Sequence, residues 1–272
     1  MPSRSLLLLL LIGLAVSYIG LNFLVRWIYP RQLFPYRGSS YESLPGLITV
    51  KSGDGNEVAF IVQPSTESGA SVLFYLHGNG EDIGTNADRF AWFNDQGYTV
   101  IALDYPGYGL TTGTPTGESV RTATLAVWEY ARDEMQVAAE DTVVWGRSLG
   151  GAPATFLATQ EKFRGLVLES TFRSVFAVAN LPVPLLIAEP FPTESIIAEV
   201  PCPIFLFHGA LDRTIPASHS QKLAEEAGDS AELFLFPEGE HNNLRFVGEN
   251  EMIQVLNTLR RRDATSEVKQ PH

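Results

Sequence analysis

Residues 143–154, VVWGRSLGGAPA, place a serine between two glycines in the pattern G-x-S-x-G, formed by Gly146, Ser148 and Gly150. A run of apolar, β-favouring residues stops at Gly146 and small, helix-compatible residues follow, so the segment predicts a strand, a very tight turn and a helix. Glycines avoid the Cβ clashes of such a turn, and the turn places the serine at a helix N-terminus, where backbone N–H groups favour a developing oxyanion. The pattern predicts that Ser148 is a nucleophile; a glycine-rich turn with a capping serine is the alternative.

A serine hydroxyl needs a base to take its proton and a carboxylate to orient that base. Among the five histidines, His241 in FPEGEHNNL directly follows the last expected strand and is predicted to be the base, with an exposed loop histidine as the alternative. Asp212 in HGALDRTIP follows the preceding strand and is predicted to be the acid, which gives the order Ser, Asp, His along the chain. Glu169, at the end of GLVLES, is the fallback acid.

The oxyanion of an acyl-transfer reaction needs backbone donors. The segment LHGNG, residues 76–80, supplies a glycine-rich loop, and we expect the N–H of Asn79 to act together with the N–H of Leu149 behind the nucleophile. A simple turn is the alternative for this loop. Asp104 in LDYPGYG lies among turn-forming residues, so we expect a structural role for it.

The elements that must position these residues alternate along the chain between strands and helices. Apolar runs without in/out alternation are typical of strands covered on both faces, as in a parallel sheet with crossover helices. The sequence therefore predicts an α/β fold with eight strands, the first two forming an antiparallel hairpin. The expected strands are 46–50, 58–63, 71–78, 98–105, 142–146, 165–170, 203–209 and 231–237; the expected helices cover about 86–94, 116–135, the residues after Ser148, 218–227 and 250–262.

Two stretches interrupt this alternation. Residues 171–200 are apolar, rich in proline and too long for an ordinary connection, and we expect a short lid over the cleft. Its apolar side chains suit an acyl chain or an apolar ester, although core packing would explain them equally well; they are Phe176, Leu181, Leu185, Leu186 and Ile187. The polar tail 263–272 is predicted to be disordered, and residues 46–262 are predicted to form the main domain.

The N-terminal segment 1–29 contains about 20 uncharged, mostly apolar residues between Leu6 and Val25, enough to cross a bilayer as a helix. We interpret it as a single-pass anchor, followed by a linker over 30–45. A signal peptide cleaved near the small residues 15–17 is the alternative. Arginines after the segment favour a cytoplasmic domain, whereas a signal-like start favours export, so the side of the membrane is left open.

The formal net charge of -12 argues against a nucleic-acid partner, which would need a basic face. The single cysteine, Cys202, permits no intramolecular disulfide, and the sequence contains no HExxH or EF-hand pattern, so we predict neither a metal nor a cofactor. The expected partners are a small-molecule or lipid-like acyl substrate and the membrane, and the oligomeric state is left open.

Five blocks, FYLHGNG, LDYPGYG, WGRSLGGAPA, FLFHGALDRTIP and EGEHNN, occur in this order and together resemble the short-lid serine hydrolases of the α/β-hydrolase superfamily. That branch holds membrane-associated depalmitoylases and proteins similar to serine aminopeptidases. The resemblance implies an α/β-hydrolase fold, a triad of Ser148, Asp212 and His241, and an oxyanion hole at Asn79 and Leu149. A membrane segment at the N-terminus also recurs in that branch.

The sequence thus predicts a hydrolase of carboxylic esters or thioesters that works through an acyl-serine intermediate. Peptidase or acyltransferase activity on the same triad is the alternative among enzymes, and a selective prolyl aminopeptidase is disfavoured because the inserted lid is short. A non-catalytic, membrane-tethered binding protein is the alternative from another class.

Overall fold

The computed structural model describes residues 4–35, 38–179 and 190–260. It contains an eight-stranded sheet with the strand order β1-β2-β4-β3-β5-β6-β7-β8. β1 pairs with β2 and β2 with β4 in antiparallel fashion, and the other neighbouring strands are parallel. The predicted α/β class with a mostly parallel eight-stranded sheet is confirmed. The strands are β1 (Leu47–Lys51), β2 (Glu57–Gln63), β3 (Ser71–Leu76), β4 (Tyr98–Leu103), β5 (Thr142–Arg147), β6 (Gly165–Glu169), β7 (Ile204–Gly209) and β8 (Ala231–Phe236).

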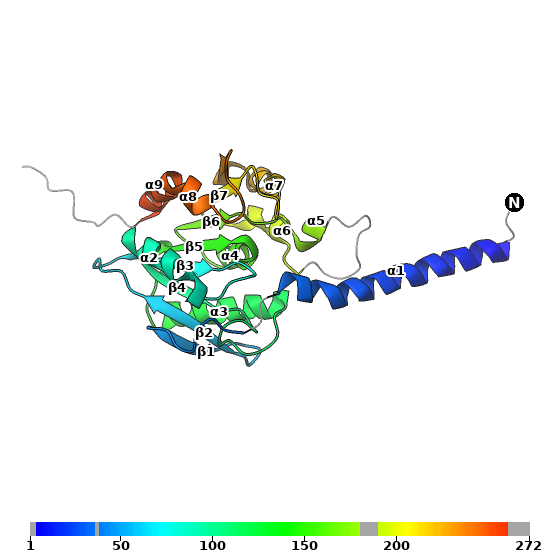
Figure 1. Cartoon of the computed structure of the whole chain (residues 1–272), viewed down its shortest axis with the longest axis horizontal. Coiled ribbons are helices and arrows are strands. Elements are labelled where there is room, and N and C mark those ends of the chain that lie inside the picture. Colours follow the sequence, from blue (N-terminus) through cyan, green and yellow to red (C-terminus); the bar gives the residue numbers. More distant parts are fainter. Residues whose placement is uncertain (1–3, 36–37, 180–189, 261–272) are drawn as a thin grey trace, which may run out of the picture.

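Helices cover both faces of this sheet, as predicted (Figure 1). Successive strand residues point to opposite faces, so Phe74 and Val144 pack in one apolar cluster and Tyr75 and Trp145 in the other. Residues of α3, α4 and α7 complete the first cluster, and residues of α2 and α9 complete the second. The helices are α1 (Arg4–Leu33), α2 (Ala87–Asp95), α3 (Gly117–Asp133), α4 (Gly151–Ala158), α5 (Val175–Ala179), α6 (Thr193–Ile196), α7 (Ser218–Ala227), α8 (Leu244–Val247) and α9 (Glu249–Leu259).

The C-terminal helical region differs from the prediction. One helix is expected over 250–262, whereas the structure has the short α8, a junction at Gly248 and then α9, which ends at Leu259. A Cβ at Gly248 would collide with the ring of Phe236, so this junction has little room for a larger residue. The tail 263–272 lies outside the described residues.

The predicted lid region contains two short helices between β6 and β7. α5 lies near the N-terminal end of this region and α6 near its C-terminal end. Of the five apolar residues singled out in the sequence, Phe176 belongs to α5. Leu181, Leu185, Leu186 and Ile187 lie outside the described residues.

α1 extends away from the sheet (Figure 1). It is long and apolar enough to span a membrane. The leucines from Leu6 to Leu11 are between 50 and 66 % exposed, so this part of α1 is not a core helix of the domain. Its apolar side chains face outward on the molecule.

Two aromatic residues in the segment predicted as a linker over 30–45, Phe34 and Tyr41, are buried against the domain. The helix continues to Leu33, and the next residue, Phe34, is fully buried with its ring centroid 6.4 Å from that of Tyr108. Tyr41 donates a hydrogen bond to the buried carboxylate of Asp104. The burial of these two aromatic side chains attaches the segment after α1 to the domain.

A buried ion pair joins α2 to the carboxyl end of β6. Arg89 Nη1 and Nη2 lie 2.6 and 3.1 Å from the two carboxylate oxygens of Glu169, and Trp145 Nε1 donates a further hydrogen bond to that carboxylate at 3.1 Å. Burial alone would raise the pKa of Glu169, but the positive charges of Arg89 and Arg147 outweigh burial and lower it. Glu169 is therefore ionised in the folded protein at neutral pH.

The packing of Phe34 predicts that Phe34→Ala destabilises the domain. The substitution removes a fully buried ring, and we expect the free energy of unfolding to fall by about 3–5 kcal/mol. Urea unfolding followed by near-ultraviolet circular dichroism measures this change. Phe246→Ala is the matched control because Phe246 is 72 % exposed, and it should change the free energy of unfolding by less than about 0.5 kcal/mol. Equal effects of the two substitutions would show that Phe34 is not part of the core.

The Arg89–Glu169 pair predicts a pH-dependent effect of Glu169→Gln. The substitution removes one partner of a buried pair and leaves the charge of Arg89 without its carboxylate. We expect the free energy of unfolding to fall by about 3–5 kcal/mol at pH 7. Because the pKa of Glu169 is lowered by folding, its contribution is complete above the unfolded-state pKa of about 4.3 and is lost as the pH falls through the folded-state pKa. Urea unfolding between pH 7 and pH 3.5 measures the free energy of unfolding of the parent and of the variant. The difference between these two free energies should be constant near neutrality and should become smaller below about pH 4. A difference that does not change with pH would contradict this account.

Candidate active site

Ser148 lies in a strained turn between β5 and α4. Its φ is +50°, in the left-handed region that residues other than glycine rarely adopt. The flanking glycines are required because a Cβ at Gly150 would collide with the carbonyl of Leu76 at the end of β3, and one at Gly146 would collide with the carbonyl of Gly150. Thr171 Oγ1 donates a hydrogen bond of 2.9 Å to the carbonyl of Ser148 and holds the turn from the β6 side. The expected strand, tight turn and helix are therefore present.

The structure brings Ser148, His241 and Asp212 together at the carboxyl ends of three parallel strands. His241 Nε2 lies 3.1 Å from Ser148 Oγ, and His241 Nδ1 lies 2.7 Å from Asp212 Oδ2. These two contacts use both ring nitrogens and form one hydrogen-bonded chain. With Nδ1–H donating to the carboxylate, Nε2 is free to accept the serine proton.

The carboxylate of Asp212 is buried and well supplied with donors. Its Oδ1 accepts hydrogen bonds of 2.8 Å from the N–H groups of Thr214 and Ile215. His208 Nε2 lies 3.4 Å from Oδ2. Burial raises the pKa of this carboxyl, but hydrogen bonds from His208, His241 and Ile215 outweigh that effect and hold its pKa well below the ordinary value. Asp212 is thus ionised across the neutral range and can stabilise a protonated His241.

Glu169, the fallback acid, occupies a different place. Its carboxylate is held by Arg89 and Trp145, as described for the sheet, whereas the carboxylate in contact with His241 belongs to Asp212. The geometry therefore favours Asp212 over Glu169 as the partner of the histidine. Asp104 accepts hydrogen bonds from Tyr41 and from the Ile83 N–H, which fits the structural role expected for it.

The loop after β3, which carries Asn79, is fixed by two tyrosines of the following LDYPGYG segment. Tyr105 Oη donates to the carbonyl of His77 at 2.7 Å, and Tyr108 Oη donates to the carbonyl of Asn79 at 3.0 Å. Asn79 and Leu149 both line the same cavity as Ser148. The two residues predicted to supply oxyanion donors are thus brought to the nucleophile, and the tyrosines fix the backbone of one of them.

Arg147, the residue before the serine, connects two catalytic loops and was not predicted as a site residue. Its Nη1 pairs with Glu81 in the loop after β3, and its Nη2 donates a hydrogen bond of 2.6 Å to Asn242 Oδ1, next to the histidine. Burial alone would raise the pKa of Glu81, but the charge of Arg147 and weaker contributions lower it. The only sequence signal for this link is the charged residue inside the otherwise apolar and small G-x-S-x-G segment.

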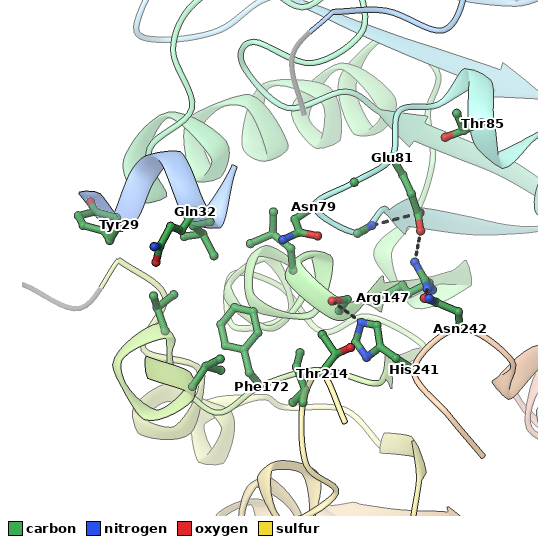
Figure 2. A pocket seen from close by; sticks show the side chains of 18 of the residues that line it. Tyr29, Gln32, Asn79, Glu81, Thr85, Arg147, Phe172, Thr214, His241 and Asn242 are labelled. Carbon is green, nitrogen blue, oxygen red and sulfur yellow. Dashed lines mark hydrogen bonds and ion pairs between the residues drawn. The ribbon is translucent and has the colours of Figure 1, made fainter. Parts of the chain in front are cut away.

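Ser148 and His241 line a cavity of about 940 Å³. Figure 2 shows His241 and Arg147 on one side of it and Tyr29 and Gln32, from the end of α1, on the other. Phe172, at the start of the lid region, lies between them on a third side. A nucleophile that faces a cavity of this size has room for an organic substrate. The contribution of α1 to the cavity was not foreseen from the sequence.

The arrangement can perform nucleophilic acyl transfer. A hydroxyl, an imidazole and a buried carboxylate at hydrogen-bond distances are the parts that such a reaction requires, and backbone N–H groups at the elbow are suited to a developing oxyanion.

Comparisons with known proteins agree with this fold. A family model described as serine aminopeptidase, S33, matches residues 67–188. The protein YfhR of Escherichia coli O157:H7 is 31% identical over 202 residues, which cover 71% of each chain. Rv2307c of Mycobacterium tuberculosis H37Rv is 27% identical over 243 residues, which cover 85% of this chain and 86% of that protein. The esterase Pf2001 of Pyrococcus furiosus superposes with a TM-score of 0.68 at 16% identity, and the match covers 82% of this chain and 96% of the esterase.

The sheet order, the strained serine turn, the match to the serine aminopeptidase family model and the similarity to YfhR lead to one family assignment. The chain belongs to the α/β-hydrolase superfamily and is a hydrolase.

Proposed function

We propose that the protein is a membrane-anchored serine hydrolase that cleaves carboxylic ester or thioester bonds through an acyl-serine intermediate. The observation that carries the proposal is the hydrogen-bonded chain from Asp212 through His241 to Ser148, which faces a cavity of about 940 Å³. The fold likeness to an esterase of Pyrococcus furiosus is consistent with ester chemistry.

In the first half of the reaction, His241 Nε2 takes the proton of Ser148 Oγ as that oxygen attacks the substrate carbonyl carbon. The ionised Asp212 stabilises the imidazolium that forms. The N–H groups of Asn79 and Leu149 donate to the oxyanion of the tetrahedral intermediate. The intermediate collapses with loss of the alcohol or thiol, which receives the proton from His241, and the acyl group stays on Ser148.

In the second half, water replaces the leaving group. His241 removes a proton from the water as it attacks the acyl carbonyl, a second oxyanion forms at the same donors, and collapse returns the proton to Ser148 Oγ. The products are the free acid and the regenerated serine.

The membrane part of the proposal rests on α1. The exposed leucines of its first turns would present a large apolar surface to water, whereas a bilayer core would bury that surface. Trp27 is 63 % exposed near the other end of the helix, where an interfacial aromatic residue belongs. We therefore propose that α1 is an uncleaved, single-pass anchor.

Ser148→Ala should abolish hydrolysis because alanine has no oxygen to carry the acyl group. We expect p-nitrophenyl butyrate turnover to fall by at least about 10³-fold while circular dichroism remains that of the parent. Intact mass spectrometry after treatment with a fluorophosphonate should show one adduct on the parent and none on the variant. Substantial turnover by the variant would overturn the acyl-serine mechanism, and a folded parent that takes no adduct would favour the non-catalytic binding protein.

Asp212→Asn should lower kcat by about 10⁴-fold, because the amide neither stabilises the imidazolium nor holds the ring with Nδ1–H donating. Steady-state kinetics with p-nitrophenyl butyrate at pH 7 measure this loss. Glu169→Gln is the comparison variant. The Glu169 carboxylate bonds Arg89 and Trp145 and lies 3.6 Å from Arg147 Nε, whereas Asp212 bonds the histidine, so folded molecules of Glu169→Gln should lose far less kcat than those of Asp212→Asn. A large kcat loss in Glu169→Gln together with a small one in Asp212→Asn would assign the acid role to Glu169.

A further inference from the structure

We propose that the last turns of α1 form part of the acyl-binding site, so that the acyl chain of the substrate lies against α1 and reaches Ser148 from the membrane side. The inference rests on the proposed function, because it assigns the acyl half of a substrate attacked by Ser148. It goes further by giving the membrane anchor itself a role in recognising the substrate.

The first observation is the set of α1 residues that line the cavity. They recur at intervals of three and four residues and so form one stripe along the helix: Leu24, Val25, Ile28, Tyr29, Gln32 and Leu33. Four of the six are aliphatic. Leu24, Val25 and Ile28 lie on adjacent turns, so an alkyl chain in the cavity can contact aliphatic side chains along this part of α1.

The second observation is the apolar wall that faces this stripe. It comes from the start of the lid region and from α5, and its members are Phe172, Val175, Phe176 and Val178. These residues and the α1 stripe line one cavity, so an alkyl chain placed there contacts apolar side chains from two separate elements. Phe172 and Val175 also pack with the apolar core, so core packing accounts for part of this wall, and all four residues line the cavity.

The third observation is that the polarity of the cavity changes along its length. Glu81, Arg147 and Asn242 lie at the end away from α1, with His241 beside them (Figure 2). An amphiphilic ester therefore has one preferred orientation, with its acyl chain toward α1 and its alcohol or thiol toward the polar end. The carbonyl carbon is then placed at Ser148, between the two ends.

The fourth observation is that α1 is held firmly in relation to the site. Phe34, directly after the helix, is buried between Tyr108 and Phe191, and its N–H donates to the carbonyl of Pro30 at 3.0 Å. Tyr108 is the residue that bonds the carbonyl of Asn79. One aromatic contact therefore connects the end of the anchor to the loop that carries a proposed oxyanion donor.

The fifth observation locates the cavity relative to the membrane surface. Trp27 points away from the cavity-lining stripe, is 63 % exposed, and has the guanidinium of Arg31 4.3 Å from its ring centroid. This is the aromatic and cationic pair expected at the headgroup level. Since Ile28 and Tyr29 line the cavity at the same level of the helix, an anchor with Trp27 at the headgroup level would place this wall of the cavity at the bilayer surface.

This placement avoids a large energetic cost. Transfer of the CH₂ groups of a long acyl chain from the bilayer to water is unfavourable, and the cost grows with every group exposed. A cavity wall that continues into the membrane helix lets a long chain reach the serine while most of it stays in an apolar environment.

The test is a substitution that fills the acyl end of the cavity without adding charge. We expect Ile28→Trp, in the full chain reconstituted in phosphatidylcholine vesicles, to lower the ratio of kcat/KM for p-nitrophenyl palmitate to that for p-nitrophenyl butyrate by tenfold or more. Phe23→Trp is the matched control, because Phe23 is 70 % exposed and does not line the cavity, and it should keep the parent ratio. An unchanged ratio in Ile28→Trp would overturn the proposal.

A second measurement does not depend on a variant. A dodecyl fluorophosphonate with a diazirine at the end of its chain is reacted with the parent in the same vesicles, irradiated, and mapped by peptide mass spectrometry. We expect crosslinks within residues 24–33. Crosslinks confined to the polar end, around residues 242–246, would overturn the assignment of the acyl-binding site to α1. They would leave the proposed hydrolase function standing. Absence of any serine adduct would overturn the proposed function and the present inference with it.

Discussion

The left-handed backbone of Ser148 is the constraint on which the rest of the site depends. A residue other than glycine held in this region costs on the order of 1–3 kcal/mol, so the surrounding structure must enforce it. Enforcement comes from close backbone packing at Gly150 against Leu76 and from the hydrogen bond that Thr171 donates to the serine carbonyl. The first contact comes from the end of β3 and the second from the segment directly after β6, and these strands lie on either side of β5. Ser148 is therefore positioned by the centre of the sheet.

The buried charges next to the elbow have a related role. Arg147 pairs with Glu81 and hydrogen-bonds Asn242, while Glu169 is paired with Arg89. Burying charged groups is costly even when they are paired, and well-packed apolar residues often give equal or greater stability. The network instead fixes the positions of two loops relative to each other. A single guanidinium bonds the loop near Asn79 and the loop of His241, so the proposed oxyanion donors and the proposed base are held in fixed positions relative to the serine between them.

The proposed catalytic residues could be proposed from the sequence, whereas most residues around them could not, and the reason lies in the kind of signal that each part leaves. Ser148, Asp212 and His241 each follow a recognisable strand, and carboxyl ends of neighbouring parallel strands must meet at one edge of the sheet. Pairing between Arg147 and Asn242, by contrast, joins loops that are 95 residues apart and has no local pattern. The ion pair of Glu169 could not be predicted for the same reason, because its partner Arg89 lies 80 residues away in the chain. From the sequence alone, Glu169 therefore stayed a fallback acid.

The cavity-lining part of α1 was invisible in the sequence for a different physical reason. A stripe on a helix is detected by contrast with its polar faces, and α1 is apolar nearly all round, as a helix surrounded by lipid would be. Its early turns meet the requirement of a membrane span, while the turns around Ile28 line the catalytic cavity. A cleavage near residues 15–17 would remove much of the apolar span and leave the cavity wall and Phe34 in place. The proposed anchor and the cavity wall are therefore successive parts of one continuous helix, and the burial of Phe34 fixes the end of that helix to the domain that holds the cavity.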